Sequence, residues 1–226
     1  MATSGDVVLR GKRVWRQLVK EMNKGKIALI IVDMQNDFCH EDGYFHKLAR
    51  EMPKFRSLLE VRPPVEVIGR LADGFRKAGK PVICLKMELR KDYADCAIPY
   101  WKWPKSKERG FCSEGTWGSE IIADLSPEGV DIVVPKKGYG GFFNTHLETV
   151  LRNLGIETCA VTGVGTAGCV DTTVREGVAR GFKMIVVSDA TGGCDRASHD
   201  RTLLILGGAF GEVKTSSEVL LNLDDH

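Results

Sequence analysis

The sequence has no apolar run long enough to cross a membrane, no dominant charge of one sign, and no repeated or low-complexity segment. A membrane-spanning helix needs about 20 mostly apolar residues, and a secretory leader needs an apolar stretch that the N-terminus lacks. The 32 basic and 30 acidic residues give a net charge of +2, which predicts a mixed surface without the basic stripe of a nucleic-acid-binding protein. We therefore expect no membrane partner, no nucleic-acid partner and a cytoplasmic location.

Metal-binding spacing is also missing. The cysteines are odd in number and form neither a zinc motif nor a closed disulfide framework, so mostly free thiols in a reducing compartment are the simplest account. His40 and His46 lie near Asp33 in the sequence, but their spacing fits no standard zinc motif. We expect no metal and no cofactor.

Short apolar runs alternate with helical patterns, which predicts a single-domain α/β fold with a doubly wound, mostly parallel sheet and helices on both faces. Strands are expected at 27–33, 81–87, 131–136, 158–164 and 183–189, with a short one near Val213. Helices are expected at 64–78, 145–153, 169–180 and about 197–206. Residues 1–26 are assigned to an N-terminal amphipathic segment and 27–226 to the domain. The irregular segment 91–118 is expected to be a functional loop.

Three reactive side chains are expected at the carboxyl ends of strands, where open α/β sheets place their sites. Asp33 follows the first strand, Lys136 ends the third, and Cys169 comes just beyond the fourth. A thiol nucleophile, a carboxylate base and an ammonium group are the parts needed for acyl transfer through a thioester. We also expect the helix N-terminus at Cys169 to lower the pKa of its thiol.

The turn before Cys169 allows a second interpretation. Gly163-Val-Gly-Thr-Ala-Gly168 fits the G-x-G-x-x-G fingerprint, and Asp189 ends the next strand. On this motif alone the chain would be a dinucleotide-binding oxidoreductase. Too little chain follows the motif for the rest of such a sheet and a substrate domain, and pyrophosphate binding does not need a cysteine there.

Three segments resemble the signatures of the isochorismatase-like cysteine hydrolases: Ile31–Phe38 (IVDMQNDF), Pro135–Thr145 (PKKGYGGFFNT) and Thr162–Val170 (TGVGTAGCV). The resemblance runs from about Ile27 to Val219 and implies a catalytic triad of Asp33, Lys136 and Cys169. Lys136 is preferred to Lys137 because it lies six residues before Phe142, as in the family pattern. The resemblance also implies a cis peptide at Val164–Gly165 and an oxyanion hole built from the amides of Gly165 and Cys169.

Within this family the chain looks closest to the branch that hydrolyses biuret, triuret, ureidoacrylate or N-carbamoylsarcosine. The implied activity is cleavage of a ureide or carboxamide C–N bond with release of ammonia, by a homodimer or homotetramer. Two departures weaken biuret itself: Leu206 stands where biuret-cleaving relatives have glutamine, and Gly168 stands where they have a polar residue. A non-catalytic, metabolite-binding role is the other alternative. The expected substrate contacts are Gln35, Phe38, Glu88, Arg90, Trp117 and Phe142.

Overall fold

A single parallel sheet forms the centre of the molecule. The computed structural model describes residues 26–62, 65–99 and 102–223, so the expected N-terminal amphipathic segment lies outside the described residues. Within this part of the chain the strand order is β3-β2-β1-β4-β5-β6, and every neighbouring pair is parallel. The strands are β1 (Ile27–Val32), β2 (Val82–Met87), β3 (Ile132–Lys136), β4 (Thr158–Val164), β5 (Lys183–Gly192) and β6 (Glu212–Lys214).

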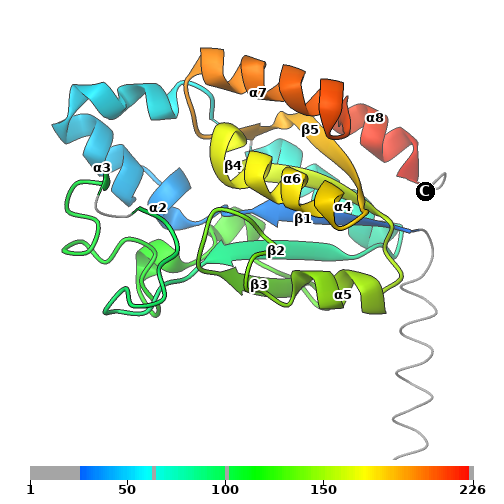
Figure 1. The fold of residues 1–226 in the computed structure, drawn as a ribbon, viewed down its shortest axis with the longest axis horizontal. Helices are drawn as coiled ribbons and strands as arrows, with labels where there is room; N and C mark the ends of the chain where they lie inside the picture. Colours follow the sequence, from blue (N-terminus) through cyan, green and yellow to red (C-terminus); the bar gives the residue numbers. More distant parts are fainter. Residues whose placement is uncertain (1–25, 63–64, 100–101, 224–226) are drawn as a thin grey trace, which may run out of the picture.

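Helices cover both faces of this sheet (Figure 1). Residues of α5 (Leu147–Asn153), α6 (Asp171–Ala179) and α7 (Arg196–Ala209) pack with Ala28, Ile30 and Val32 of β1. Residues of α4 (Val65–Lys77) and α8 (Ser216–Leu221) pack with Ile27, Leu29 and Ile31 on the opposite face. Since successive side chains of a strand point to opposite faces, a strand covered on both sides must be apolar throughout, as β1 is. The predicted doubly wound α/β fold is confirmed.

The chain reverses its winding direction between β1 and β4, the point where open α/β sheets bind ligands. These two strands run side by side with Val32 opposite Gly163. Gly163 has a φ of +104°, and a Cβ there would lie 2.1 Å from the carbonyl oxygen of Val32, so only glycine fits this close approach. The residues that follow the two strands, Asp33 and the turn leading to Cys169, are therefore neighbours in space.

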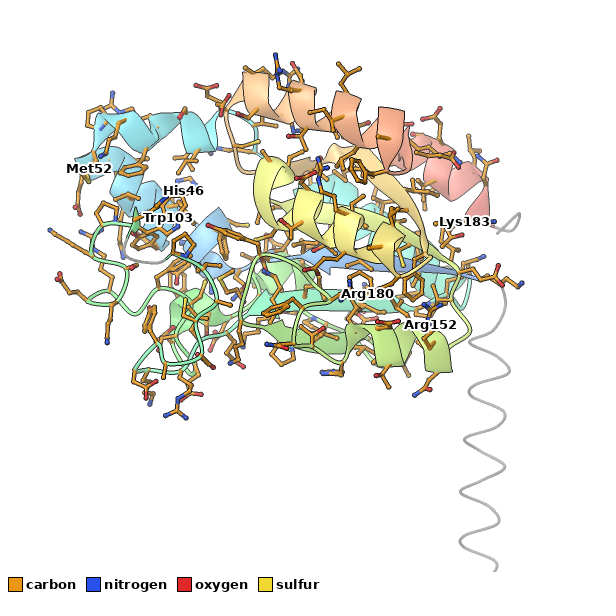
Figure 2. The ribbon with its side chains drawn as sticks, in the orientation of Figure 1. His46, Met52, Trp103, Arg152, Arg180 and Lys183 are labelled. Carbon is orange, nitrogen blue, oxygen red and sulfur yellow. The ribbon has the colours of Figure 1, made fainter. Side chains whose placement is uncertain are left out.

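Several short elements gather at this end of the sheet, on the left of Figure 1. They include α2 (Asn36–Cys39), α3 (Tyr44–Glu51) and the 3₁₀ helix η1 (Pro53–Leu59), none of which was predicted. The 3₁₀ turns η3 (Trp117–Ser119) and η4 (Ala123–Leu125) follow the segment 91–116, in which the described residues form no α-helix and no strand. Figure 2 shows Trp103 of that segment beside α3.

The helix predicted from Cys169 has a different beginning from the one expected. A π-helical turn, η5 (Thr166–Val170), comes first, and α6 continues from Asp171. A π-helical turn holds one more residue than an α-helical turn and is frequent at functional sites. Cys169 therefore lies inside this turn and not at the first position of a regular α-helix. No helix among the described residues is long and apolar enough to cross a membrane.

Candidate active site

Asp33, Lys136 and Cys169 meet beyond the carboxyl ends of the strands. The ammonium Nζ of Lys136 lies 2.8 Å from Oδ2 of Asp33 and 3.5 Å from Sγ of Cys169. It also donates a hydrogen bond of 2.8 Å to the carbonyl oxygen of Gly138. Asp33 and Lys136 have no exposed surface, and Cys169 is 6% exposed. The structure thus brings together the three side chains that the strand-end pattern singled out.

The local backbone explains this convergence. Asp33 adopts a φ of +51°, and its amide donates to the carbonyl oxygen of Leu85 on β2, which fixes the residue directly after β1. Lys136 ends β3, which is separated from β1 by β2, so its long side chain reaches across the end of β2. Lys137 takes a different direction: it forms an ion pair of 2.9 Å with Asp95 and donates to the carbonyl oxygen of Glu88.

Burial dominates the electrostatics of the cluster. It raises the pKa of Asp33 above its usual value, although the positive charge of Lys136 opposes this shift. Burial lowers the pKa of Lys136, but the negative charge of Asp33 and the contact with Cys169 outweigh it, and the pKa rises to about 12. The cation is therefore fully charged at neutral pH and paired with the Asp33 carboxylate.

The expected low pKa of Cys169 is wrong. Burial raises the pKa of this thiol to about 12, and the carboxylate of Asp33 adds to the effect, while Lys136 opposes it. The helix N-terminus was expected to favour the thiolate, but the cost of burying a second negative charge beside Asp33 is greater. Lys136 contacts both Asp33 and Cys169, so the carboxylate lies near the thiol and can serve as its base.

A cavity of about 400 Å³ opens at Cys169. The peptide bond Val164–Gly165 is cis, as the resemblance implied, and Gly165, Gly168 and Cys169 all line the cavity. A Cβ on Gly168 would have no atom within 4 Å, so this position faces open space. The strand-to-helix turn therefore presents the sulfur and adjacent backbone to the same volume, which is the arrangement that attack on a carbonyl requires.

Of the six expected substrate contacts, Phe38 alone is among the described residues that line this cavity. Gln35 is fully buried, and its amide binds backbone: it donates 2.7 Å hydrogen bonds to the carbonyl oxygens of Met87 and Ser119 and accepts one of 2.7 Å from the Met87 amide. Its role is to tie the end of β1 to β2 and η3. The prediction of a substrate contact has no support in this geometry.

The other four expected contacts are also occupied elsewhere. Glu88 pairs with Lys86 at 2.7 Å, and Arg90 pairs with Asp92 at 2.9 Å. Trp117 packs edge-on against the ring of His40. Phe142 is buried against Phe182, with ring centroids 5.7 Å apart. Trp103, in the segment expected to be a functional loop, and Tyr139, in one of the family-like segments, do line the cavity. The other lining side chains were not singled out from the sequence: Phe45, Leu58, Leu59, Thr172, Asp195 and Ser198.

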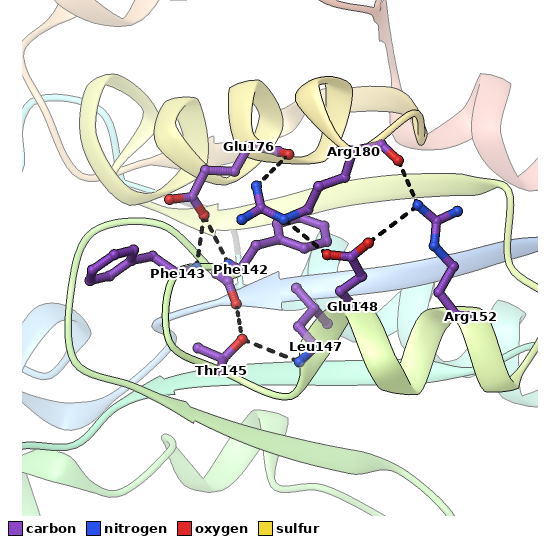
Figure 3. Close-up of polar contacts among 9 residues, drawn as sticks. Phe142, Phe143, Thr145, Leu147, Glu148, Arg152, Glu176 and Arg180 are labelled. Atoms are coloured by element: carbon purple, nitrogen blue, oxygen red, sulfur yellow. Dashed lines mark hydrogen bonds and ion pairs between the residues drawn. The ribbon is translucent and has the colours of Figure 1, made fainter.

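Glu176 is a further residue that sequence reasoning missed. Its carboxylate accepts hydrogen bonds of 2.9 and 3.2 Å from the amides of Phe142 and Phe143 (Figure 3). Arg180, directly after α6, pairs with Glu148 of α5 at 3.1 Å. These contacts tie the loop that follows Lys136 to α6, the helix that follows Cys169, and so hold the two reactive residues in register. A lone glutamate on a polar helix face gives no sequence signal for this role.

Among the described residues, no group of three or more histidine, cysteine, aspartate or glutamate side chains lies close enough together to hold a metal ion. Asp33 is the carboxylate nearest to Cys169, and the Lys136 ammonium already occupies its side. The arrangement therefore fits nucleophilic chemistry by the thiol with the carboxylate as its base.

Comparisons with known proteins identify the family of this chain. Residues 27–218 match the Isochorismatase domain family. The chain is 34% identical over 176 residues to the ureidoacrylate amidohydrolase RutB of Methylorubrum extorquens, covering 73% of this chain and 68% of that protein. RutB of Pseudomonas syringae pv. syringae is 31% identical over 182 residues, covering 75% and 72%.

Solved structures give the same result. A cysteine hydrolase from Pseudomonas syringae pv. phaseolicola superposes with a TM-score of 0.76 at 30% identity, covering 91% of this chain and 95% of that one. The N-carbamoylsarcosine amidase of Thermoplasma acidophilum superposes with a TM-score of 0.63 at 29% identity, covering 84% and 96%.

Proposed function

Because the chain belongs to the isochorismatase-like cysteine hydrolases, and is thus a hydrolase of amide C–N bonds, we propose that it cleaves a small ureide or carboxamide through a thioester on Cys169. The observation that carries this proposal is the buried contact of Lys136 with both Asp33 and Cys169 at the edge of the cavity. Relatives named for ureidoacrylate and N-carbamoylsarcosine make ureides the first substrates to test.

The first half of the reaction forms the thioester and releases ammonia. Asp33 accepts the proton of Cys169 as the sulfur attacks the substrate carbonyl, and the carbonyl oxygen gains the negative charge. The amides of Gly165 and Cys169 stabilise that oxyanion. Asp33 then passes the proton to the departing nitrogen, the C–N bond breaks, and ammonia leaves.

The second half restores the enzyme. Asp33 takes a proton from water, the resulting hydroxyl attacks the thioester carbonyl, and the C–S bond breaks with return of the proton to sulfur. The products are the acid and the free thiol of Cys169. Lys136 keeps its proton throughout, because its pKa is raised to about 12, and compensates the negative charge that moves between Asp33 and the sulfur.

The test is ammonia release from biuret, triuret, ureidoacrylate, N-carbamoylsarcosine and simple carboxamides, with Cys169→Ala and Cys169→Ser as blanks. Loss of a nucleophile should lower kcat by a factor of about 10³ or more, while the melting temperature shows that both variants fold. Release that persists in Cys169→Ala would exclude the thioester. Trapping of an acyl group on Cys169 by mass spectrometry would support it directly.

No observation favours the dinucleotide alternative. The Gly163–Gly168 turn follows β4, the fourth strand along the described chain, and leads into a cysteine in contact with Lys136, whereas the dinucleotide fingerprint lies in the first βα turn of its sheet. A homodimer or homotetramer remains part of the proposal on the family resemblance, and light scattering on the purified chain tests it.

A further inference from the structure

The cavity at Cys169 is unusually poor in charge for a site that would take a small ionic metabolite. Asp195 is the one charged side chain among the described residues that line it, and no described lysine or arginine does so. Lys136 lies behind Cys169 without exposed surface and is already paired with Asp33. A substrate carboxylate would thus find no side-chain cation within the described lining.

One wall of the cavity is aromatic and aliphatic. Phe38 stacks on Phe45 with ring centroids 5.4 Å apart, and Phe45 meets the ring of Trp103 edge-on at 5.2 Å. Leu58 and Leu59, at the end of η1, extend this surface. Rings that support one another in this way form a firm apolar wall, and covering it with an apolar group gains about 25 cal/mol per Å² removed from water.

Polar side chains that line the cavity already form hydrogen bonds within the protein. The carboxylate of Asp195 accepts a 2.8 Å hydrogen bond from the amide of Ser198, and the hydroxyl of Thr172 donates one of 2.8 Å to the carbonyl oxygen of Gly168. The hydrogen bonds from Ser198 lower the pKa of Asp195, so this side chain stays negative at neutral pH. An anionic substituent would meet that charge at close range.

Two helix N-termini lie at the described part of the cavity wall, and both are already used. Asp195 caps α7, so its carboxylate neutralises the positive end of that helix. The turn that precedes α6 supplies the amides of Gly165 and Cys169, which the proposed chemistry needs for the oxyanion. Neither terminus is free to hold a second negative group on the substrate.

We infer that this enzyme takes ureides or carboxamides whose remaining part is uncharged and apolar, an alkyl or aryl group, and that it discriminates against a carboxylate. This inference rests on the proposed function for the identity of the reacting group. The inferred preference differs from that of the relatives named for ureidoacrylate, because an acrylate carries a carboxylate. A cavity of about 400 Å³ also has room for a group larger than the carbamoyl end of biuret.

The test uses matched pairs that differ at one end only. Butylurea is compared with 4-ureidobutanoate, and hexanamide with adipic acid monoamide, because each second compound carries a carboxylate where the first has a methyl group. We expect kcat/KM for the neutral member to exceed that of the anion by about tenfold or more, a preference that corresponds to about 1.4 kcal/mol. Equal values, or a preference for the anion, would overturn the inference and leave the proposed function intact.

The same pairs are tested for binding to Cys169→Ala by calorimetry, so that the inference does not depend on turnover. If no compound is hydrolysed but the neutral members bind and the anions do not, the proposed function fails and the inference stands. If neither member binds, or the anions bind better, the inference fails. These outcomes separate the two proposals.

A charge variant tests the cause. Asp195→Asn keeps an oxygen that can cap α7 but removes the negative charge, so kcat/KM for the anions should rise about three- to tenfold relative to the neutral compounds. The control is Asp200→Asn, which removes the same charge from the same helix at an exposed position paired with Arg196. An equal change in both variants, or none in Asp195→Asn, would refute the electrostatic origin of the discrimination.

Discussion

Replacement of Lys136 by methionine isolates the buried ion pair on which the site depends. Methionine keeps an unbranched side chain of similar length and removes the charge that lies 2.8 Å from Asp33. At an effective dielectric constant of about 20, the attraction lost over that distance is about 6 kcal/mol. Breaking one partner of a buried pair costs about 3–5 kcal/mol in practice, because the remaining charge can relax or become neutral. We expect Lys136→Met to lose stability in this range.

A double-mutant cycle of Lys136→Met and Asp33→Asn separates the energy of the ion pair from the packing of the two side chains. Asp33→Asn leaves the Lys136 ammonium with Cys169 and Gly138 as its partners, so we expect a loss similar to that of Lys136→Met. The double variant buries no charge at either position, and its loss should be smaller than the sum of the single losses by about 2 kcal/mol or more.

Urea denaturation followed by circular dichroism measures these differences, and pH gives an independent check. Since the pKa of Asp33 is raised in the folded state, the folded protein binds more protons than the unfolded chain between the unfolded and the folded pKa. Its stability therefore falls as pH rises through that window. Loss of Lys136 raises the pKa of Asp33 in the folded state further, so the pH range over which stability falls extends to higher pH.

The loss of stability in Lys136→Met should accordingly be smaller at about pH 5 than at about pH 8, because an ionised, unpaired Asp33 costs most at the higher pH. The matched control is Lys137→Met, which removes the neighbouring half-buried lysine and its pair with Asp95, and for which we expect a loss of about 1 kcal/mol or less. This account of the site would be refuted if the stability losses of the two single variants added up to that of the double variant within about 0.5 kcal/mol. It would also be refuted if the loss in Lys136→Met did not change with pH.

Three further predictions concern the reactive turn and its support. Because burial raises the pKa of Cys169 to about 12, its alkylation by iodoacetamide should rise about tenfold per pH unit between about pH 7 and 9; a rate independent of pH, by mass spectrometry, would contradict this. Gly168→Ala should change the free energy of unfolding by less than about 1 kcal/mol but alter KM, because its Cβ enters the cavity. Gly165→Ala should be clearly less stable, because its Cβ lies 3.0 Å from the Gly193 carbonyl oxygen. Glu176→Leu should lose about 1–3 kcal/mol of stability and lower kcat. Glu176→Gln should recover part of both, because its amide oxygen can still accept from the Phe142 and Phe143 amides; equal losses in both variants would contradict this role of the acceptor oxygen.

The sheet could be predicted because its signal is local. A strand buried on both faces must be continuously apolar, and the runs at 27–33 and 158–164 match β1 and β4 within one residue. The segment between Asp33 and Pro63 gave no such signal. Its helix α3 has two turns, and the residues that it buries, such as Tyr44 and Leu48, pack against partners distant in the sequence. Its contribution to the cavity wall follows from tertiary contacts, which periodicity does not contain.

The reactive residues could be predicted for a related reason, and their surroundings could not. Asp33, Lys136 and Cys169 each end or follow a strand, and a parallel sheet brings such ends to one edge. The position of Glu176 depends on a contact with Phe142, 34 residues away, across two elements whose spacing only the fold defines. The pKa of Cys169 also escaped prediction, because the effect of a helix N-terminus can be read from sequence while the extent of burial cannot.

The high pKa of Cys169 is compatible with its proposed role as the nucleophile, because the buried site favours one distribution of charge. With a neutral thiol, the ammonium of Lys136 and the carboxylate of Asp33 compensate each other. A resting thiolate would add a second anion beside Asp33 and leave a net negative charge without access to water, which burial disfavours. In the proposed mechanism the thiolate forms only as its proton moves to Asp33 and the negative charge passes on to the substrate oxygen. Since the raised pKa of Asp33 makes it a better proton acceptor than an exposed aspartate, the same burial that keeps the thiol unreactive at rest strengthens the base that activates it.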